Sequence, residues 1–164
     1  MPGRLNHYFA IHKALRQMMF ESSLEVARTD FAVGDYRPVL ERFKRCMYWL
    51  HAHSGHEDRH IHTALEACAE GCTQEFAEAH QVLGARAEAL EKLADQIAAS
   101  EDPGKRTGLG AQLQIRLNAL IGEYLVHMSR EETHGMAMLW AHFDDEQLMG
   151  IVQKAQAAIP PGEP

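Results

Sequence analysis

The sequence predicts an all-α protein, an up-down-up-down four-helix bundle with a short extra C-terminal helix. Apolar residues recur every three or four positions along four long stretches, and no stretch of any length shows the alternation of a β-strand. Each break between these stretches contains Gly or Pro. Short connections make consecutive helices antiparallel neighbours, which favours the bundle. We expect one domain over residues 1–159 and a disordered tail over 160–164.

The first two helices are expected over residues 4–28 and 37–69. Gly34 lies in the break between them, and Pro38 suits the first turn of the second helix. Gly71 is a plausible stop. Each stretch has one inward stripe at the spacing of a buried helix face. The inward positions are Leu5, Phe9, His12, Leu15, Met19 and Val26, then Val39, Phe43, Cys46, Leu50, His53, Glu57, His60 and Ala64.

The third and fourth helices are expected over residues 74–99 and 109–140. Thr73 suits the N-cap of the third helix, and residues 100–110, with a proline and three glycines, form the next break. Residues 144–158 are expected to form the short terminal helix, packed outside the bundle. The inward positions are Phe76, His80, Leu83, Ala87, Leu90, Ala94 and Ile97, then Leu113, Leu117, Leu120, Tyr124, His127, Glu131, His134 and Met138.

The composition fits a soluble globular protein, with 46% hydrophobic and 24% charged residues. A net charge of −7 argues against nucleic acid or an anionic membrane as a partner. No run approaches the ~20 apolar residues that span a bilayer. The N-terminus lacks the apolar core of a signal peptide, and the three cysteines form no CxxC pair, which favours a cytoplasmic location. We expect a monomer or a homodimer.

One pattern occurs twice and carries the functional prediction. Each copy reads His-x-x-x-Glu-x-x-His, with His53, Glu57 and His60 in the first and His127, Glu131 and His134 in the second. Around the axis of an α-helix, the Glu lies about 40° from the first His. The second His lies about 20° from the first His, so all three share one face. Each copy is preceded by a histidine on the inward stripe of the previous helix, His12 or His80. The antiparallel layout brings these groups to similar heights.

These residue types predict a site for two metal ions. Imidazole suits iron, zinc and copper, and a carboxylate can bridge two cations. Each ion would have two imidazoles, a share in two carboxylates and room for a bridging oxo or hydroxo group. An open position would remain for a diatomic ligand such as O2 or NO, or for peroxide. The predicted ligands are His12, His53, Glu57, His80, His127 and Glu131, with His60 and His134 as further candidates for a sixth ligand or an outer group.

Taken in order, four elements make the chain resemble the hemerythrin-like, HHE cation-binding domain family over residues 4–140. They are His12, His53-Ser-Gly-His-Glu57-Asp, His80-Gln-Val-Leu and His127-Met-Ser-Arg-Glu131-Glu. The resemblance implies a non-haem di-iron centre inside a four-helix bundle, with the four histidines as terminal ligands and the two glutamates as bridges.

The sequence departs from the oxygen-carrying hemerythrins in two respects. Gly84 stands where they have a second histidine on the third helix, and Glu131 follows His127 by four residues instead of five. The pattern is closer to the bacterial HHE proteins and the iron-sensing branch. It argues against simple reversible O2 carriage. It favours binding or sensing in stress response, storage or iron handling over an enzyme.

Other interpretations stay open at this point. Glu57-x-x-His60 and Glu131-x-x-His134 also match ferritin-like di-iron proteins, but that class needs a Glu on each of the other two helices. A peroxidase or ferroxidase could use the same centre, and a metal-free bundle could carry a polar network instead. A recombinant sample can carry zinc or nickel in place of iron. Among the other histidines, we expect His51 and His62 to face solvent.

Overall fold

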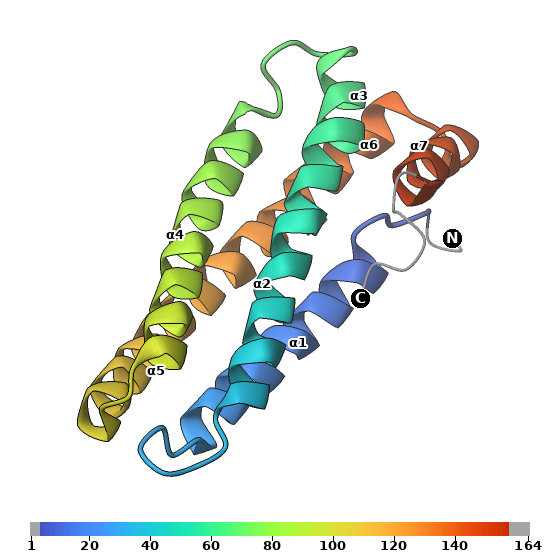
Figure 1. Ribbon diagram of the computed structural model, residues 1–164. Coiled ribbons are helices and arrows are strands. Elements are labelled where there is room, and N and C mark those ends of the chain that lie inside the picture. The colour runs from blue at the N-terminus through green and yellow to red at the C-terminus, as the bar shows by residue number, and fades with distance from the viewer. Residues whose placement is uncertain (1–3, 158–164) are drawn as a thin grey trace.

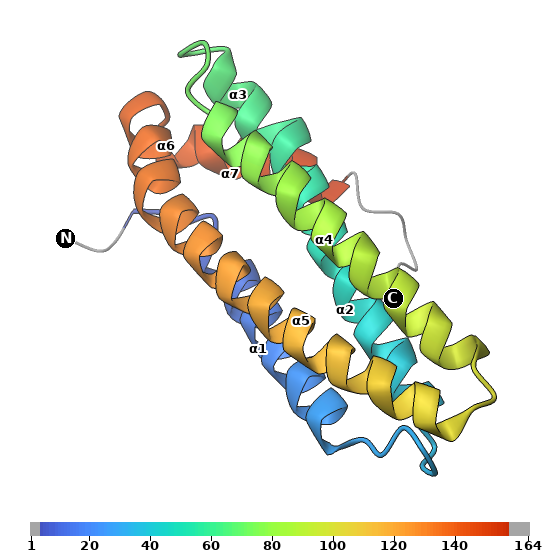
Figure 2. The same cartoon turned by 90° about the vertical axis from the view of Figure 1, so that its left-hand side faces the viewer.

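The computed structural model describes residues 4–157 and confirms the all-α bundle (Figures 1 and 2). Four helical rods form a ring in which each rod packs against the rods before and after it. The first rod is α1 (Phe9–Arg28), and the second joins α2 (Arg37–His56), η1 (Glu57–His62) and α3 (Thr63–Glu66). The third is α4 (Gln74–Ala99), and the fourth joins α5 (Pro103–Arg130), η2 (Glu131–Gly135) and α6 (Met136–His142). A short helix, α7 (Asp145–Ala157), follows, and the tail expected over 160–164 lies outside the described residues.

Several helix ends differ from the predicted ones because side chains bind free backbone groups there. α5 begins at Pro103, not at residue 109, since the Asp102 carboxylate accepts hydrogen bonds from the N–H groups of Gly104 and Lys105. α1 begins at Phe9 instead of residue 4, and the Asn6 side chain accepts from the N–H groups of Tyr8 and Phe9. The second rod ends at Glu66, a few residues before the predicted end.

The two segments η1 and η2 are π-helical, and each begins at the glutamate of a repeated motif. A π-turn contains one residue more than an α-turn, so the buried face moves by about one position. Beyond Glu57 the buried residues are Ile61, His62 and Leu65, not His60 and Ala64, and beyond Glu131 they are Gly135, Met136 and Leu139, not His134 and Met138. The predicted inward stripes are therefore wrong past each glutamate.

Two apolar clusters fill the bundle on either side of a polar layer. The larger one runs through the part that holds the 28–37 and 99–103 connections. The smaller one, here the end cluster, consists of Tyr8, Ile61, Leu65, Met136, Leu139 and Leu148. Leu148 belongs to α7, so this helix packs on the bundle end next to the start of α1 (Figure 1). Phe9 was expected inward but is 67% exposed, because Tyr8 takes the buried position beside it.

No helix among residues 4–157 is long and apolar enough to cross a membrane.

Candidate metal centre

Six buried side chains meet between the two apolar clusters, and none is more than 9% exposed. They come from all four rods, and both glutamates stand at the first position of a π-segment. Their ligand atoms form two groups, each with atoms within 4.8 Å of one another. One group contains the first histidine pair, His12 and His53, and the other contains the second histidine pair, His80 and His127. Glu57 and Glu131 belong to both groups.

The Glu57 carboxylate turns one oxygen toward each histidine pair. Its Oε1 lies 3.2 Å from His53 Nε2 and 3.8 Å from His12 Nε2, while its Oε2 lies 3.3 Å from His80 Nε2. The Nε2 atoms of His12 and His53 are themselves 3.1 Å apart. The carboxylate therefore spans the two groups in the manner required of a bridge between two cations.

Glu131 also turns one oxygen toward each histidine pair, but with Oε2 facing the first pair and Oε1 facing the second. Its Oε2 lies 3.4 Å from His12 Nε2, and its Oε1 lies 3.3 Å from His80 Nε2 and 2.9 Å from His127 Nε2. Both glutamates thus divide their oxygens between the pairs, and all four imidazoles present Nε2. The six residues of the predicted ligand set are brought together.

Polar atoms at the middle of this layer lack hydrogen-bond partners. Both oxygens of Glu57, Oε2 of Glu131 and Nε2 of His127 are buried without a partner of suitable geometry, despite the close approaches between them. Buried polar atoms are rarely left in this state, because their desolvation is not compensated. Converging carboxylate oxygens and imidazole nitrogens are the donor set that a divalent transition metal takes, so the residues fit two bound cations.

The electrostatics of the layer favour positive charge within it. Burial lowers the pKa of His80, but the hydrogen bond with Glu131 and the close approach of the Glu57 carboxylate outweigh it and raise the pKa to about 10. Burial likewise opposes ionisation of Glu57, yet the field of His53 and the close approach of His12 and His80 hold its pKa well below the usual range. A protonated imidazole here occupies the place of a cation, and a metal would displace its proton.

Two carboxylates that the sequence analysis did not assign orient histidines from behind. His80 Nδ1 donates to Asp58 Oδ1 at 2.8 Å, and His12 Nδ1 donates to Glu132 Oε1 at 3.0 Å. Such a bond fixes the tautomer, so that Nε2 offers its lone pair to the metal. Asp58 and Glu132 each follow a bridging glutamate directly. The acidic pairs at 57–58 and 131–132 were the signal available in the sequence.

The outer partners of these two carboxylates differ. Arg16 binds Glu132 with two hydrogen bonds of 2.6 and 3.0 Å. Asp58 instead accepts a 2.9 Å bond from His62 Nδ1, and the His62 ring stacks on the His80 ring with centroids 5.3 Å apart. The prediction that His62 faces solvent is wrong. His62 follows Glu57 by five positions, and in a π-helix that spacing is one hydrogen-bonded turn, so His62 lies next to the ligand layer.

The two additional ligand candidates do not reach the centre. His134 is exposed, and His60 is half-buried with its Nε2 buried and without a hydrogen-bond partner. Neither belongs to a group of ligand atoms. The π-turn that starts at each glutamate rotates these histidines away from the face they would occupy on an α-helix. The Glu-x-x-His halves of the motifs therefore contribute only their glutamates, which leaves the ferritin-like interpretation without its histidines.

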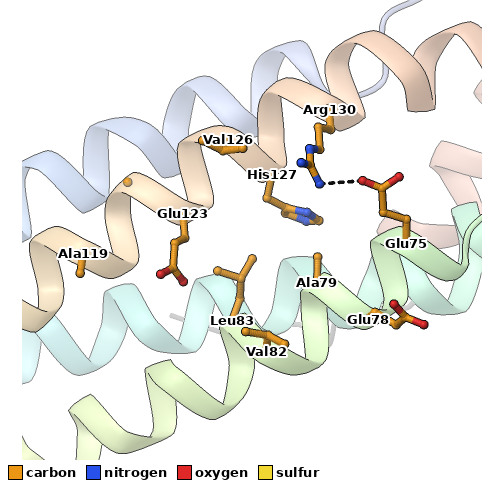
Figure 3. Close-up of a pocket in the computed structure, with 11 residues that line it drawn as sticks. Glu75, Glu78, Ala79, Val82, Leu83, Ala119, Glu123, Val126, His127 and Arg130 are labelled. Atoms are coloured by element: carbon orange, nitrogen blue, oxygen red, sulfur yellow. Dashed lines mark hydrogen bonds and ion pairs between the residues drawn. The ribbon is translucent and has the colours of Figure 1, made fainter.

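Each histidine pair has a cavity beside it. A groove of about 610 Å³ between α4 and α5 has His127 in its lining (Figure 3). Glu75 and Arg130 form a 2.6 Å ion pair across one part of it, and Val82 and Val126 are among its apolar lining. A smaller cavity of about 360 Å³ has His53 and Glu57 in its lining and is covered by α7.

The comparison with protein families agrees with this geometry. The family model described as the hemerythrin HHE cation binding domain matches residues 5–146, most of the chain. A comparison with curated proteins gives no match. With the buried groups of His and Glu, the match supports a metal-binding helical protein. The chain belongs to the hemerythrin HHE cation-binding domain family.

Proposed function

We propose that this protein holds a non-haem di-iron centre that binds O2, NO, peroxide or a related small ligand. The observation that carries the proposal is the division of oxygens between the histidine pairs, made by Glu57 and by Glu131 alike. The ligand roles proposed are terminal for His12, His53, His80 and His127, and bridging for Glu57 and Glu131.

Iron bound there would supply open coordination and one-electron chemistry for a small ligand. Each ion would have two imidazoles and two carboxylate oxygens from the protein, fewer than six ligands. The surrounding residues keep the ligand set rigid. Asp58 and Glu132 fix two imidazoles from behind, and Tyr8 stacks on His12 with ring centroids 5.0 Å apart. Apolar clusters pack the bundle on either side of the layer.

The biological setting that fits such a centre is sensing, storage, stress response or iron handling in the cytoplasm, by a monomer or homodimer. Nucleic acid and membranes are not proposed as partners, because the chain carries a net charge of −7. The donor set also accepts zinc or nickel, so a recombinant sample needs control of the metal supply.

Metal content and an optical spectrum test the proposal. The protein should be expressed in iron-rich medium and purified without nickel resin. We expect two irons per chain and near-ultraviolet charge-transfer bands that change when azide or NO is added. His53→Ala and Glu131→Ala should remove these bands, whereas Glu88→Gln, at an exposed position of α4, should retain them. A folded, metal-free protein that takes up no iron would contradict the proposal, and rapid turnover of peroxide would favour the enzymatic alternative.

A further inference from the structure

The cavity beside the first histidine pair is a separate feature of the molecule with a volume of about 360 Å³. Its walls come from four places in the chain, namely residues 5–11 around the start of α1, the end of α2, η1 and α7. Residues far apart in sequence therefore line it, and α7 supplies one of its walls. His53 and Glu57 of the metal centre lie in its lining.

Small side chains in the wall leave the volume of this cavity open. Ala10 of α1, Ala52 of α2 and Ala155 of α7 all line the cavity, each on a different helix. The rest of the wall is mostly apolar, with Trp49 of α2 and Val152 of α7 among the larger side chains. Such a wall does not bind ordered water well, since a buried water needs two to four polar partners.

Polar groups are few and are mainly imidazoles. His7 and His56 line the cavity in addition to His53 and Glu57. Burial lowers the pKa of His7, which favours the neutral ring with one donor and one acceptor. The Asn6 oxygen is already engaged by two N–H groups at the start of α1. An apolar chamber with a few convergent polar groups is the usual form of a small-molecule site.

The size exceeds what a diatomic ligand needs. A water molecule takes roughly 30 Å³ in the liquid, and O2 or NO is of similar size. The cavity is on the order of ten times larger and falls at the lower end of the roughly 300–1,000 Å³ range of organic-ligand pockets. A gas alone would leave most of the apolar wall without a contact.

We propose that this cavity binds a small organic molecule with an apolar body and a compact anionic oxygen head group. The body lies against Trp49, Ala52 and Val152, and the head points to His53 and Glu57. The inference rests on the proposed function, because two cations held by two carboxylates give that end of the cavity a net positive charge. A protein that binds only a gas at this centre would not need an organic ligand of this class.

Fluorescence titration with octanoate tests the proposal, because octanoate has the stated chemistry and Trp49 lines the cavity. The titration uses zinc-loaded protein, since zinc takes the same donors and does not quench tryptophan by absorption. The chain has two tryptophans, so Trp140→Phe leaves Trp49 as the reporter. We expect a saturable change in Trp49 emission.

Two matched substitutions locate the binding. Ala52→Leu fills this cavity, and Ala119→Leu adds the same atoms to the groove between α4 and α5. We expect Ala52→Leu to weaken octanoate binding by about tenfold or more and Ala119→Leu to leave it within about twofold. Circular dichroism and zinc content check that both variants fold and load metal.

No saturable binding, or equal effects of the two substitutions, would overturn the inference. That failure is distinguishable from failure of the proposed function. A protein that takes up two irons with azide-sensitive bands but shows no octanoate binding retains the di-iron function and lacks the organic-ligand site. Octanoate binding that Ala52→Leu weakens supports the inference whatever diatomic ligand the centre prefers.

Discussion

The two halves of the candidate metal centre have matching sets of His and Glu residues and different surroundings. Both contain a histidine pair and share the two glutamates. Behind His12, Glu132 is held by the permanently charged Arg16, whereas behind His80, Asp58 is held by the ring of His62. The first pair has the α7-covered cavity beside it, and the second has the α4–α5 groove. A repeated motif can thus create two equivalent binding positions while tertiary neighbours make them chemically unequal.

The largest effect should come from residues that both halves share. Glu57→Ala removes an oxygen from each group of ligand atoms, so we expect metal content to fall from two ions per chain to nearly none. His127→Ala removes a ligand from the second group only, so roughly one ion per chain should remain. Elemental analysis of the purified proteins gives both values. Equal losses in the two variants would show that the halves do not bind metal separately.

The orienting carboxylates should give the next largest effect, and it should be specific to one half. Glu132→Gln and Asp58→Asn each weaken the hold on one imidazole, for which losses of about 10- to 100-fold in metal affinity are typical. We expect the greater loss for Glu132→Gln, because its side chain is 28% exposed against 44% for Asp58 and it also pairs with Arg16. Competition with a chelator measures the affinities. A greater loss of metal affinity for Asp58→Asn would contradict this expectation and show that the carboxylate behind His80 matters more than the one behind His12.

The dependence of stability on pH should differ between metal-free and loaded protein. The folded-state pKa of His80, about 10, lies above its unfolded value of about 6.5. Protonated His80 therefore stabilises the metal-free fold fully below pH 6.5, and this contribution is lost as the pH rises toward 10. We expect the Tm of metal-free protein to fall by several degrees across that window.

In metal-loaded protein the same imidazole would be a neutral ligand, so the Tm of the loaded form should change less over this pH range. Thermal unfolding followed by circular dichroism, with and without chelator, makes the comparison. A parallel fall in both forms would show that His80 is not the group responsible.

The smallest effect concerns the packing of the first half. A Cβ at Gly135 would lie 3.2 Å from the Tyr8 hydroxyl oxygen and 3.4 Å from its ring, and Tyr8 stacks on His12. We expect Gly135→Ala to destabilise the fold by about 1 kcal/mol, because the tyrosine must shift. Gly122→Ala is the matched control, since nothing lies within 4 Å of its Cβ position, and it should stabilise by about 0.5–1 kcal/mol. Urea unfolding of both variants checks the opposite signs.

Much of the fold and the inner site could be predicted from the sequence, because both depend on short-range periodicity. Apolar stripes in α4 and α5 place Leu83, Leu90, Leu113 and Leu117 in the core as expected. His53 and Glu57, like His127 and Glu131, are four residues apart and lie on one face whatever the partner helix does. Antiparallel rods then bring His12 and His80 to the same level.

The residues and the cavity that surround these His and Glu side chains could be known only from the tertiary structure. π-turns are rare and occur mostly as single turns within α-helices, so residue spacing alone did not predict η1 and η2. The change of register in η1 turned His60 away and brought His62 beside His80, and the change in η2 turned His134 away. The α7-covered cavity likewise exists only because a C-terminal helix packs beside the first turns of α1. Local spacing thus determined which residues could reach the metal layer, and long-range packing decided what surrounds each half of it.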